Sequence, residues 1–362
     1  MQAAMCPTSI RPMVRFVGRP TMHAPRRPAL TRPVVRLVGR SAGSAPDAWL
    51  AIFGCDSAIG ASRVIAVLLL LLIAAPAWSG MVPATILGKV AGPRALALGD
   101  AAGALENDPT LIWDNPSSPA RTAKSMISLG GQRGIFGQGQ GQIVALKVTD
   151  NHDVLGFGLT MDDAGSAFLA TADGTTRKVS IQRDFLGLLG YSRRLGSKTS
   201  VGVAAKLLRS ELLDQYWAHA FMADAGVITQ LTGSLKAGVA VQNLGTNLRY
   251  AETSGHLPTS ARGGLAYGWA WSAGRGLPDL VVMSADGVYS VFEQVVGWRG
   301  GLEFGWRGNA VFRLGYRGDV RQDSGLMSAG VGFAAGRYRM DYGIGYSSTV
   351  GYPQSLSLTF SF

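Results

Sequence analysis

After residue 79, the side chains best suited to acid–base or metal chemistry are three histidines and one pair of adjacent aspartates. His152 and His256 lie in turn-like stretches, and only His219 lies within a strand-like segment. A serine near His219 would suit a hydrolase, but no Ser, His and acid fall at a spacing that predicts one. Asp162 and Asp163 are expected to be solvated in a turn rather than to bind Ca²⁺. The sequence therefore predicts no enzyme, no cofactor and no metal site.

Seven charged residues in the middle of alternating segments are better candidates for function. They occupy the faces opposite apolar residues: Lys206, Lys236, Arg299, Glu303, Arg313, Arg339 and Asp341. Burying such charges unpaired in a soluble core costs several kcal/mol each. The wet interior of a β-barrel holds them without that cost. We expect them to line a lumen and to pair with one another or with a segment inside it, with direct substrate binding as the alternative.

Beyond residue 80 the chain is dominated by short segments in which apolar and polar residues alternate. In RYRMDYGIGYSS, for example, Tyr338, Met340 and Tyr342 share one face while Arg339 and Asp341 share the other. A period of two is typical of β-strands with one apolar face. About fourteen such segments can be counted, near 124–132, 141–149, 153–161, 184–196, 199–211, 216–230, 233–243, 260–272, 277–287, 293–306, 308–317, 325–336, 337–347 and 353–362.

The spacing of aromatic residues favours a transmembrane barrel over a soluble β-sandwich. Trp298 and Trp306 share one face, and so do Tyr338 and Tyr346, eight positions apart in each case. Eight residues of a tilted strand span about 20 Å along the membrane normal, which puts one aromatic residue near each interface. The predicted fold is all-β: a transmembrane, antiparallel, up-and-down β-barrel of about 14 strands over residues 124–362.

The last eight residues, SLSLTFSF, alternate in the same way and end on a bare aromatic residue. Leu356, Leu358, Phe360 and Phe362 are expected to face lipid. Phe360 and Phe362 also resemble the C-terminal signal by which outer-membrane assembly machinery recognises the last strand of a barrel, although Ser357 stands where that signal usually has glycine. We therefore expect outer-membrane lipid and the barrel assembly machinery to be partners of this chain.

The first 79 residues differ in composition from the rest. Residues 1–60 are rich in Arg and Pro without periodicity, and are expected to be a disordered leader or to lie upstream of the true translation start. Residues 61–79 combine an apolar run, Val64–Ala75, with a small-residue cleavage site at Ala77–Ser79, as in a signal peptide. Residues 1–79 hold nine arginines and two aspartates, and so most of the formal charge of +11. The remainder shows no basic surplus that would predict nucleic-acid binding.

The region between the signal peptide and the first strand, residues 80–123, does not alternate and is too irregular to face lipid. It carries a motif formed by Arg94, Gly99, Ala101, Asp108, Trp113, Asn115 and Pro116. Further motif residues follow in the barrel: Asp224, Gly226, Asn243, Gly245, Leu257, Pro258, Arg262 and Gly264, then the stretches FRLGYR, GLMSAGVGF and MDYGIGY. In this order, over about residues 92–362, they resemble the PorV/PorQ family of outer-membrane proteins, relatives of the long-chain fatty-acid transporter barrels.

The resemblance implies a barrel in the bacterial outer membrane with residues 80–123 inside it as a plug or hatch. It also implies a structural or accessory role in protein secretion of the type IX kind, with secretion-system proteins as partners. Two alternatives stay open: passage of hydrophobic small molecules, with hydrophobic ligands as partners, and an outer-membrane lipid hydrolase. For residues 80–123 the alternative is a tail outside the barrel. Asn115 and Pro116 are expected to form a tight turn.

Overall fold

The computed structural model describes residues 84–134, 138–170, 175–251, 253–271, 279–319, 322–347 and 351–362. The leader and signal peptide expected at 1–60 and 61–79 lie outside the described residues. Within the described part of the chain, no helix is long and apolar enough to cross a membrane.

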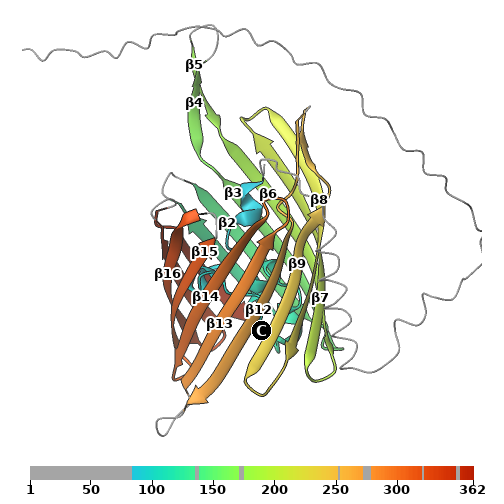
Figure 1. The fold of residues 1–362 in the computed structure, drawn as a ribbon, viewed down its shortest axis with the longest axis vertical. Coiled ribbons are helices and arrows are strands. Elements are labelled where there is room, and N and C mark those ends of the chain that lie inside the picture. Colours follow the sequence, from blue (N-terminus) through green and yellow to red (C-terminus); the bar gives the residue numbers. More distant parts are fainter. Residues whose placement is uncertain are drawn as a thin grey trace, which may run out of the picture. The chain divides into compact units, whose positions relative to one another are not determined.

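Among the described residues, fourteen strands form a closed antiparallel barrel (Figure 1). They are β1 (Met126–Arg133), β2 (Gly139–Val148), β3 (Val154–Asp163), β6 (Gln182–Leu195), β7 (Thr199–Leu212), β8 (Tyr216–Gln230), β9 (Leu235–Gly245), β12 (Ser260–Trp271), β13 (Asp279–Ser290), β14 (Val295–Trp306), β15 (Ala310–Asp319), β16 (Gln322–Ala335), β17 (Tyr338–Tyr346) and β18 (Gln354–Ser361). The last strand closes the sheet by pairing with β1 from Met126–Ser361 to Arg133–Gln354. The predicted all-β barrel of about 14 strands is confirmed.

The two ends of the barrel differ in their connections. At one end, called the turn end, short turns join the strands, as in the connection from β6 to β7. The C-terminus lies at this end as well. At the other, called the loop end, connections carry two separate hairpins, β4 (Ser166–Ala170) with β5 (Thr176–Ser180) and β10 (Leu248–Tyr250) with β11 (Thr253–Gly255). Figure 1 shows β4 and β5 rising above the barrel. Short and long connections on opposite ends are typical of up-and-down membrane barrels.

The outer face of the barrel is apolar. Trp298 and Trp306 are 53% and 47% exposed at opposite ends of β14, and Tyr338 and Tyr346 are 57% and 50% exposed at opposite ends of β17. Other exposed apolar side chains on the strands include Leu129, Ile143, Phe157, Leu189, Val203, Phe221, Leu265, Met283, Leu302, Leu314, Phe333, Met340, Leu356 and Leu358. Such a band, with aromatic residues at both edges, is the surface that a transmembrane barrel presents to hydrocarbon.

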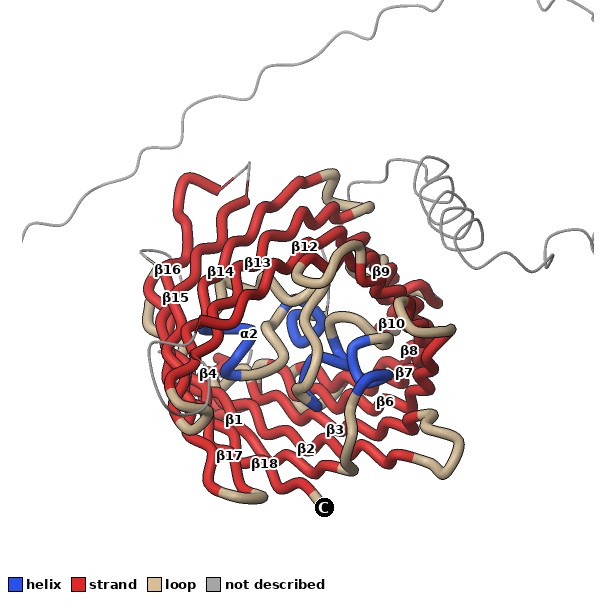
Figure 2. Tube along the Cα trace, turned by 90° about the horizontal axis from the view of Figure 1, so that it is seen from below, coloured by secondary structure: helices blue, strands red, loops and turns tan. Residues whose placement is uncertain are grey.

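Residues 84–123, called the plug segment from here on, lie inside the barrel rather than in a tail outside it (Figure 2). The segment contains η2 (Thr85–Gly88), α2 (Pro93–Ala97), η3 (Pro109–Trp113) and η4 (Ser118–Arg121). A proline stands in the first turn of α2, η3 and η4, where the missing N–H leaves no hydrogen bond unmade. Asp108 caps η3 by accepting a hydrogen bond from the backbone of Thr110. All residues of α2 and η3 are buried.

Candidate functional site

A chain of buried ion pairs joins the plug segment to β14, β15 and β17. Arg94, in α2, donates from Nε and Nη2 to the carboxylate of Glu303 on β14, both at 2.9 Å. Arg313 on β15 donates to the same carboxylate (2.7 Å) and, through Nη1, to Asp341 on β17 (2.7 Å). All four side chains are buried. Because each charge has a partner, the Coulombic attraction offsets much of the cost of removing the charges from water.

Arg339 continues this chain back to the plug segment. Its guanidinium donates to Asp341 (2.7 Å) and to Asp108 of the plug segment (2.6 Å). Burial by itself would raise the pKa of Asp108, but the guanidinium groups of Arg339 and Arg94 outweigh that effect and lower the pKa below its ordinary value. The Asp108 carboxylate is therefore ionised at neutral pH and ties η3 to β17.

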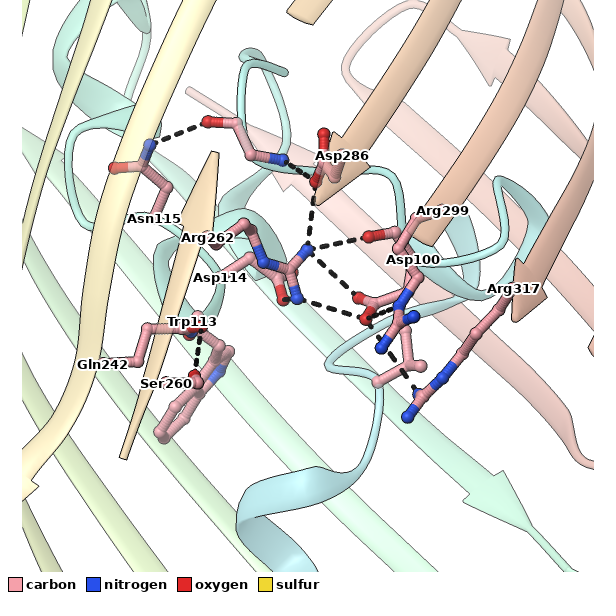
Figure 3. Close-up of polar contacts among 12 residues, drawn as sticks. Asp100, Trp113, Asp114, Asn115, Gln242, Ser260, Arg262, Asp286, Arg299 and Arg317 are labelled. Atoms are coloured by element: carbon pink, nitrogen blue, oxygen red, sulfur yellow. Dashed lines mark hydrogen bonds and ion pairs between the residues drawn. The ribbon is translucent and has the colours of Figure 1, made fainter. Parts of the chain in front are cut away.

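A second cluster surrounds Arg262 on β12 at the centre of the lumen. Its guanidinium contacts Asp100 and Asp114 of the plug segment, at 3.1 and 3.5 Å, and Asp286 of β13 at 3.3 Å. Arg299 on β14 reaches Asp100 as well, at 3.5 Å. Figure 3 shows the three carboxylates converging on the Arg262 side chain. The cluster joins three barrel strands, β12, β13 and β14, to two separate points of the plug segment.

The two lysines proposed from the sequence to line the lumen are also paired. Lys206 on β7 contacts Asp224 on β8 (Nζ to Oδ2, 2.5 Å) and donates to the side chain of Asn243 on β9 (3.1 Å). Lys236 on β9 pairs with Glu106 of the plug segment. The structure thus places all seven candidate lumen residues inside the barrel. Each is paired with the plug segment or with another residue of the inner wall.

Two residues of the family motif form the turn expected at the end of η3. Asn115 donates from Nδ2 to the carbonyl oxygen of Gly103 (2.8 Å), and its Oδ1 accepts from the backbone N–H of Ser117 (3.0 Å). The carbonyl oxygen of Pro116 accepts a hydrogen bond from Ser192 on β6 (2.7 Å). This turn therefore fastens the plug segment both to itself and to the barrel wall.

Two further motif residues lie in close contact with the wall. Gly99 has a φ of 63°, and a Cβ there would lie 2.4 Å from the carbonyl oxygen of Tyr316. Only glycine therefore fits. The carbonyl oxygen of Trp113 accepts from Gln242 on β9 (2.7 Å), and the ammonium group of Lys206 lies 5.8 Å from the centre of the Trp113 ring. With Arg94, these residues show that the motif holds the plug segment in place.

An apolar wall faces the other side of the plug segment. Its buried, inward-facing residues come from β2, β3, β6, β7 and β8, and they are Val144, Leu146, Val154, Leu186, Leu188, Ala204, Leu208, Ala218, Ala220 and Met222. Ile86, Ile112 and Trp113 of the plug segment pack against this wall. Leu248 and Leu257, from the connection between β9 and β12, belong to the same cluster.

Glycines on the apolar wall make room for the plug segment. Cδ1 of Ile112 lies only 2.2 and 2.7 Å from where a Cβ on Gly156 or Gly190 would stand. The expectation of a wet, polar interior therefore does not hold for this patch of the inner wall, although Asp162, Asp184 and Lys206 face inward from the same strands. On β6, Leu186 and Leu188 point inward while Phe185 lies on the other face, so period-two alternation gave no sign of an apolar lumen there.

Sequence reasoning missed the acidic partners of the lumen cations. Asp100, Glu106 and Asp114 lie in the plug segment, whose irregular sequence has no period from which a side-chain direction could be inferred. Asp286 lies in a predicted strand, in the stretch SADGVYS, and its alternation with outward-facing residues could have predicted that it faces the lumen. Of the acidic partners of Arg262, only Asp286 could therefore have been found from the sequence.

Two adjoining cavities lie inside the barrel. The central cavity, about 130 Å³, is bordered by Trp113, Asp114, Lys206, Arg262, Arg299 and Val288, among others. The side cavity, about 250 Å³, is bordered by apolar groups of Val90, Leu96, Leu326 and Pro353 together with Gln132 and Gln138. Gly88, Lys89, Gln140 and Arg317 border both cavities. The lumen therefore offers a polar compartment next to a more apolar one.

Four buried polar atoms of residues at the central cavity have no hydrogen-bond partner among the described residues. Two are Oε1 of Gln140 and Nε of Arg262. The other two are Nε1 of Trp113 and Oδ2 of Asp114, which belong to adjacent residues that are only 7% and 5% exposed. Burial raises the pKa of Asp114 to about 7; the Arg262 guanidinium opposes the rise and the Asp100 carboxylate adds to it. The Asp114 carboxyl therefore changes its protonation state near neutral pH.

The three histidines that the structure describes do not form a catalytic constellation. His219 is exposed on the outer face of β8, His152 lies in the turn between β2 and β3, and His256 stacks on Phe292 with ring centres 4.6 Å apart. Within the described ranges, no group of three His, Cys, Asp or Glu side chains is placed to hold a metal ion.

Comparison of the sequence with protein-family models and with curated proteins finds no match. Solved structures do match. The toluene transporter TodX of Pseudomonas putida aligns over 79% of this chain and 99% of its own, with a TM-score of 0.57 and 10% identity. The monoaromatic hydrocarbon channel CymD aligns over 75% of this chain and 97% of its own, with a TM-score of 0.53 and 12% identity. This chain therefore has the barrel fold found in TodX and CymD.

Proposed function

We propose that this chain is an outer-membrane barrel through which small hydrophobic molecules pass, and that the plug segment controls their passage. The observation that carries the proposal is the apolar inner wall. The interior of a transmembrane barrel is ordinarily polar, so side chains such as Leu146, Leu186 and Leu188 facing the lumen suit an apolar solute. The two similar structures, described as a toluene transporter and a hydrocarbon channel, support the same proposal.

The same proposal gives the barrel an orientation. The loop end faces the outside of the cell and the turn end faces the periplasm, because long connections lie outside in barrels of this kind. Residues 61–79 export the chain as a signal peptide. Phe360 and Phe362 present the C-terminal strand to the assembly machinery at the turn end, where Phe360 packs on Tyr338 with ring centres 5.1 Å apart.

The PorV/PorQ resemblance favours the alternative role in protein secretion. However, the motif residues Arg94, Gly99, Asn115 and Pro116 all fasten the plug segment to itself or to the wall. Such contacts serve any plugged barrel, whether it passes a solute or binds a secretion protein. The motif therefore supports a plugged barrel, and the apolar inner wall favours solute passage. A lipid hydrolase has no supporting constellation among the described residues.

Uptake and secretion can be compared in one experiment. A deletion strain, complemented with the wild-type gene, is tested for uptake of a labelled monoaromatic hydrocarbon and for its set of secreted proteins. Uptake should fall on deletion while the secreted proteins stay unchanged. In a complementation with Val288→Trp, which fills the central cavity, uptake should stay low; Met283→Trp, on the outer face of the same strand, should restore it. Normal uptake with a loss of secreted proteins would replace this proposal by the secretion role.

A further inference from the structure

The central cavity is electrically balanced although many of its border residues are charged. Five cations border it: Lys89, Lys206, Arg262, Arg299 and Arg317. Each of them contacts an aspartate: Asp162 for Lys89, Asp224 for Lys206, and Asp100 for all three arginines. Neither an anion nor a cation therefore finds an unpaired opposite charge in this cavity. A neutral polar group fits it better than a charged one.

The unpartnered atoms of the adjacent residues Trp113 and Asp114 define the kind of neutral group. Nε1 of Trp113 can only donate a hydrogen bond, and Oδ2 of Asp114 can only accept one once the carboxyl is ionised, above a pH of about 7. Leaving a buried polar atom without a partner costs about 1–3 kcal/mol. A hydroxyl group both donates and accepts, so one hydroxyl in this cavity can satisfy both atoms. A hydrocarbon in the same place satisfies neither.

Both unpartnered side chains are held in place by the barrel. The backbone carbonyl of Trp113 accepts a hydrogen bond from Gln242 on β9, and the other carboxylate oxygen of Asp114 contacts Arg262 on β12. Figure 3 shows both residues beside the Arg262 cluster. Their positions are therefore set before any ligand arrives, which lowers the entropic cost of binding.

The side cavity supplies the second half of a binding site. It adjoins the central cavity at Gly88, Lys89 and Gln140, and Val90 and Leu96 give it an apolar border. A molecule with a polar end and an apolar body can therefore occupy both compartments at once.

We propose that the central cavity binds the hydroxyl group of a phenol or other hydrophobic alcohol whose apolar body lies in the side cavity. The indole N–H of Trp113 donates to the ligand oxygen, and the ligand O–H donates to Asp114. The proposal rests on the proposed function and narrows its substrate class from hydrocarbons to hydroxylated hydrophobic molecules.

The test compares the affinities of the protein for two ligands of nearly equal shape, 4-ethylphenol and 4-ethyltoluene. Binding to purified full-length protein in lipid nanodiscs is measured by equilibrium dialysis, with empty nanodiscs as the blank. The phenol should bind about tenfold more tightly, because it alone satisfies the two buried atoms. Trp113→Phe removes the N–H and keeps most of the ring, so it should weaken 4-ethylphenol binding about fivefold and leave 4-ethyltoluene binding unchanged. Trp298→Phe, on the outer face, is the matched control and should change neither affinity.

The outcomes separate this proposal from the function on which it rests. Equal affinities of the wild-type protein for the two ligands would overturn the hydroxyl site and leave hydrocarbon passage standing. If neither ligand binds, both proposals fail. Phenol binding that Trp113→Phe leaves unchanged would also overturn the site assignment. Folding of Trp113→Phe is checked by comparing its mobility in a detergent gel before and after heating. If the variant does not fold, the affinities of the wild-type protein for the two ligands decide whether the hydroxyl site exists.

Discussion

The plug segment meets the barrel wall in two chemically different ways. Toward β12–β17, called the ionic side, Arg94, Asp100 and Asp108 form ion pairs with strand residues. Toward β2–β8, called the apolar side, Ile112 and Trp113 pack on aliphatic side chains, and Lys89 adds an ion pair with Asp162 on β3. Ion pairs with hydrogen bonds are directional and fix one position, whereas apolar contacts tolerate shifts and exchanges of similar volume. The ionic side therefore sets where the plug segment sits, and the apolar side is where a hydrophobic solute can compete with it.

The two sides should also respond differently to loss of one residue. On the ionic side, removing one partner leaves a buried charge without compensation. On the apolar side, removing a side chain leaves a cavity, whose cost depends on how far its neighbours relax. Three predictions test this difference.

The largest effect is expected on the ionic side. Glu303→Ala leaves Arg94 without its carboxylate partner and removes one of the two partners of Arg313, so it should lower the free energy of unfolding by about 3–5 kcal/mol. Urea unfolding in detergent, followed by tryptophan fluorescence, measures the change. Glu211→Ala, on a partly exposed site of β7, is the control and should cost well under 1 kcal/mol.

A double variant sharpens the same prediction. Arg94→Leu combined with Glu303→Leu removes both charges of one pair, and Arg313 keeps its contact with Asp341. The double variant should be more stable than Glu303→Ala. An equal or larger loss in the double variant would show that the ion pair itself, rather than the uncompensated charge, dominates on this side.

A smaller effect is expected on the apolar side. Ile112→Ala removes a fully buried side chain from the contact with Gly156 and Gly190 and should cost about 2–4 kcal/mol. This loss should be the same at low and high salt, because no charge is involved. On the ionic side, salt weakens only those ion pairs that are in contact with water. A marked salt dependence of the Ile112→Ala effect, measured in the same urea assay, would contradict the division into two sides.

The smallest effect concerns pH, because two carboxyls of the plug segment titrate in opposite senses. The pKa of Asp108 is lowered, so its contribution is present above the unfolded value and is lost as the pH falls through the lower folded value. The pKa of Asp114 is raised from 3.8 to about 7, so the folded state holds its proton and loses stability as the pH rises from 3.8 toward 7. Unfolding midpoints measured from pH 3 to pH 8 should therefore fall as the pH drops below about 4, where Asp108 takes up a proton, and should also decline between about pH 4 and pH 7 because of Asp114.

Asp114→Asn isolates the upper part of this pH profile. The variant has no titratable group at that position, so the decline toward pH 7 should become shallower while the acid limb stays as it is. A decline that is as steep in the variant as in the wild type would show that Asp114 does not set it.

The sequence predicted the strands well because one face of most of them touches lipid. Leu356 and Leu358 alternate with Ser357 and Thr359, and the structure has the two leucines 50% exposed and the two hydroxyl residues buried. The plug segment obeys no such period, so neither its helices nor the partners of Asp100 could be derived from the sequence alone. The apolar wall was missed for a related reason: in the middle of β6, from Phe185 to Leu189, both faces are apolar, and alternation reports only a difference between faces.

The last four strands of the barrel close around the N-terminal plug segment. The plug segment precedes β1, yet α2 contacts β15, β16, β17 and β18, the last strands to be made. The plug segment also contacts β1 through η3, so one short stretch of chain touches the strands on both sides of the seam between β1 and β18. The first and last strands of the cylinder are thus joined twice, once by their own backbone pairing and once through the segment that they enclose.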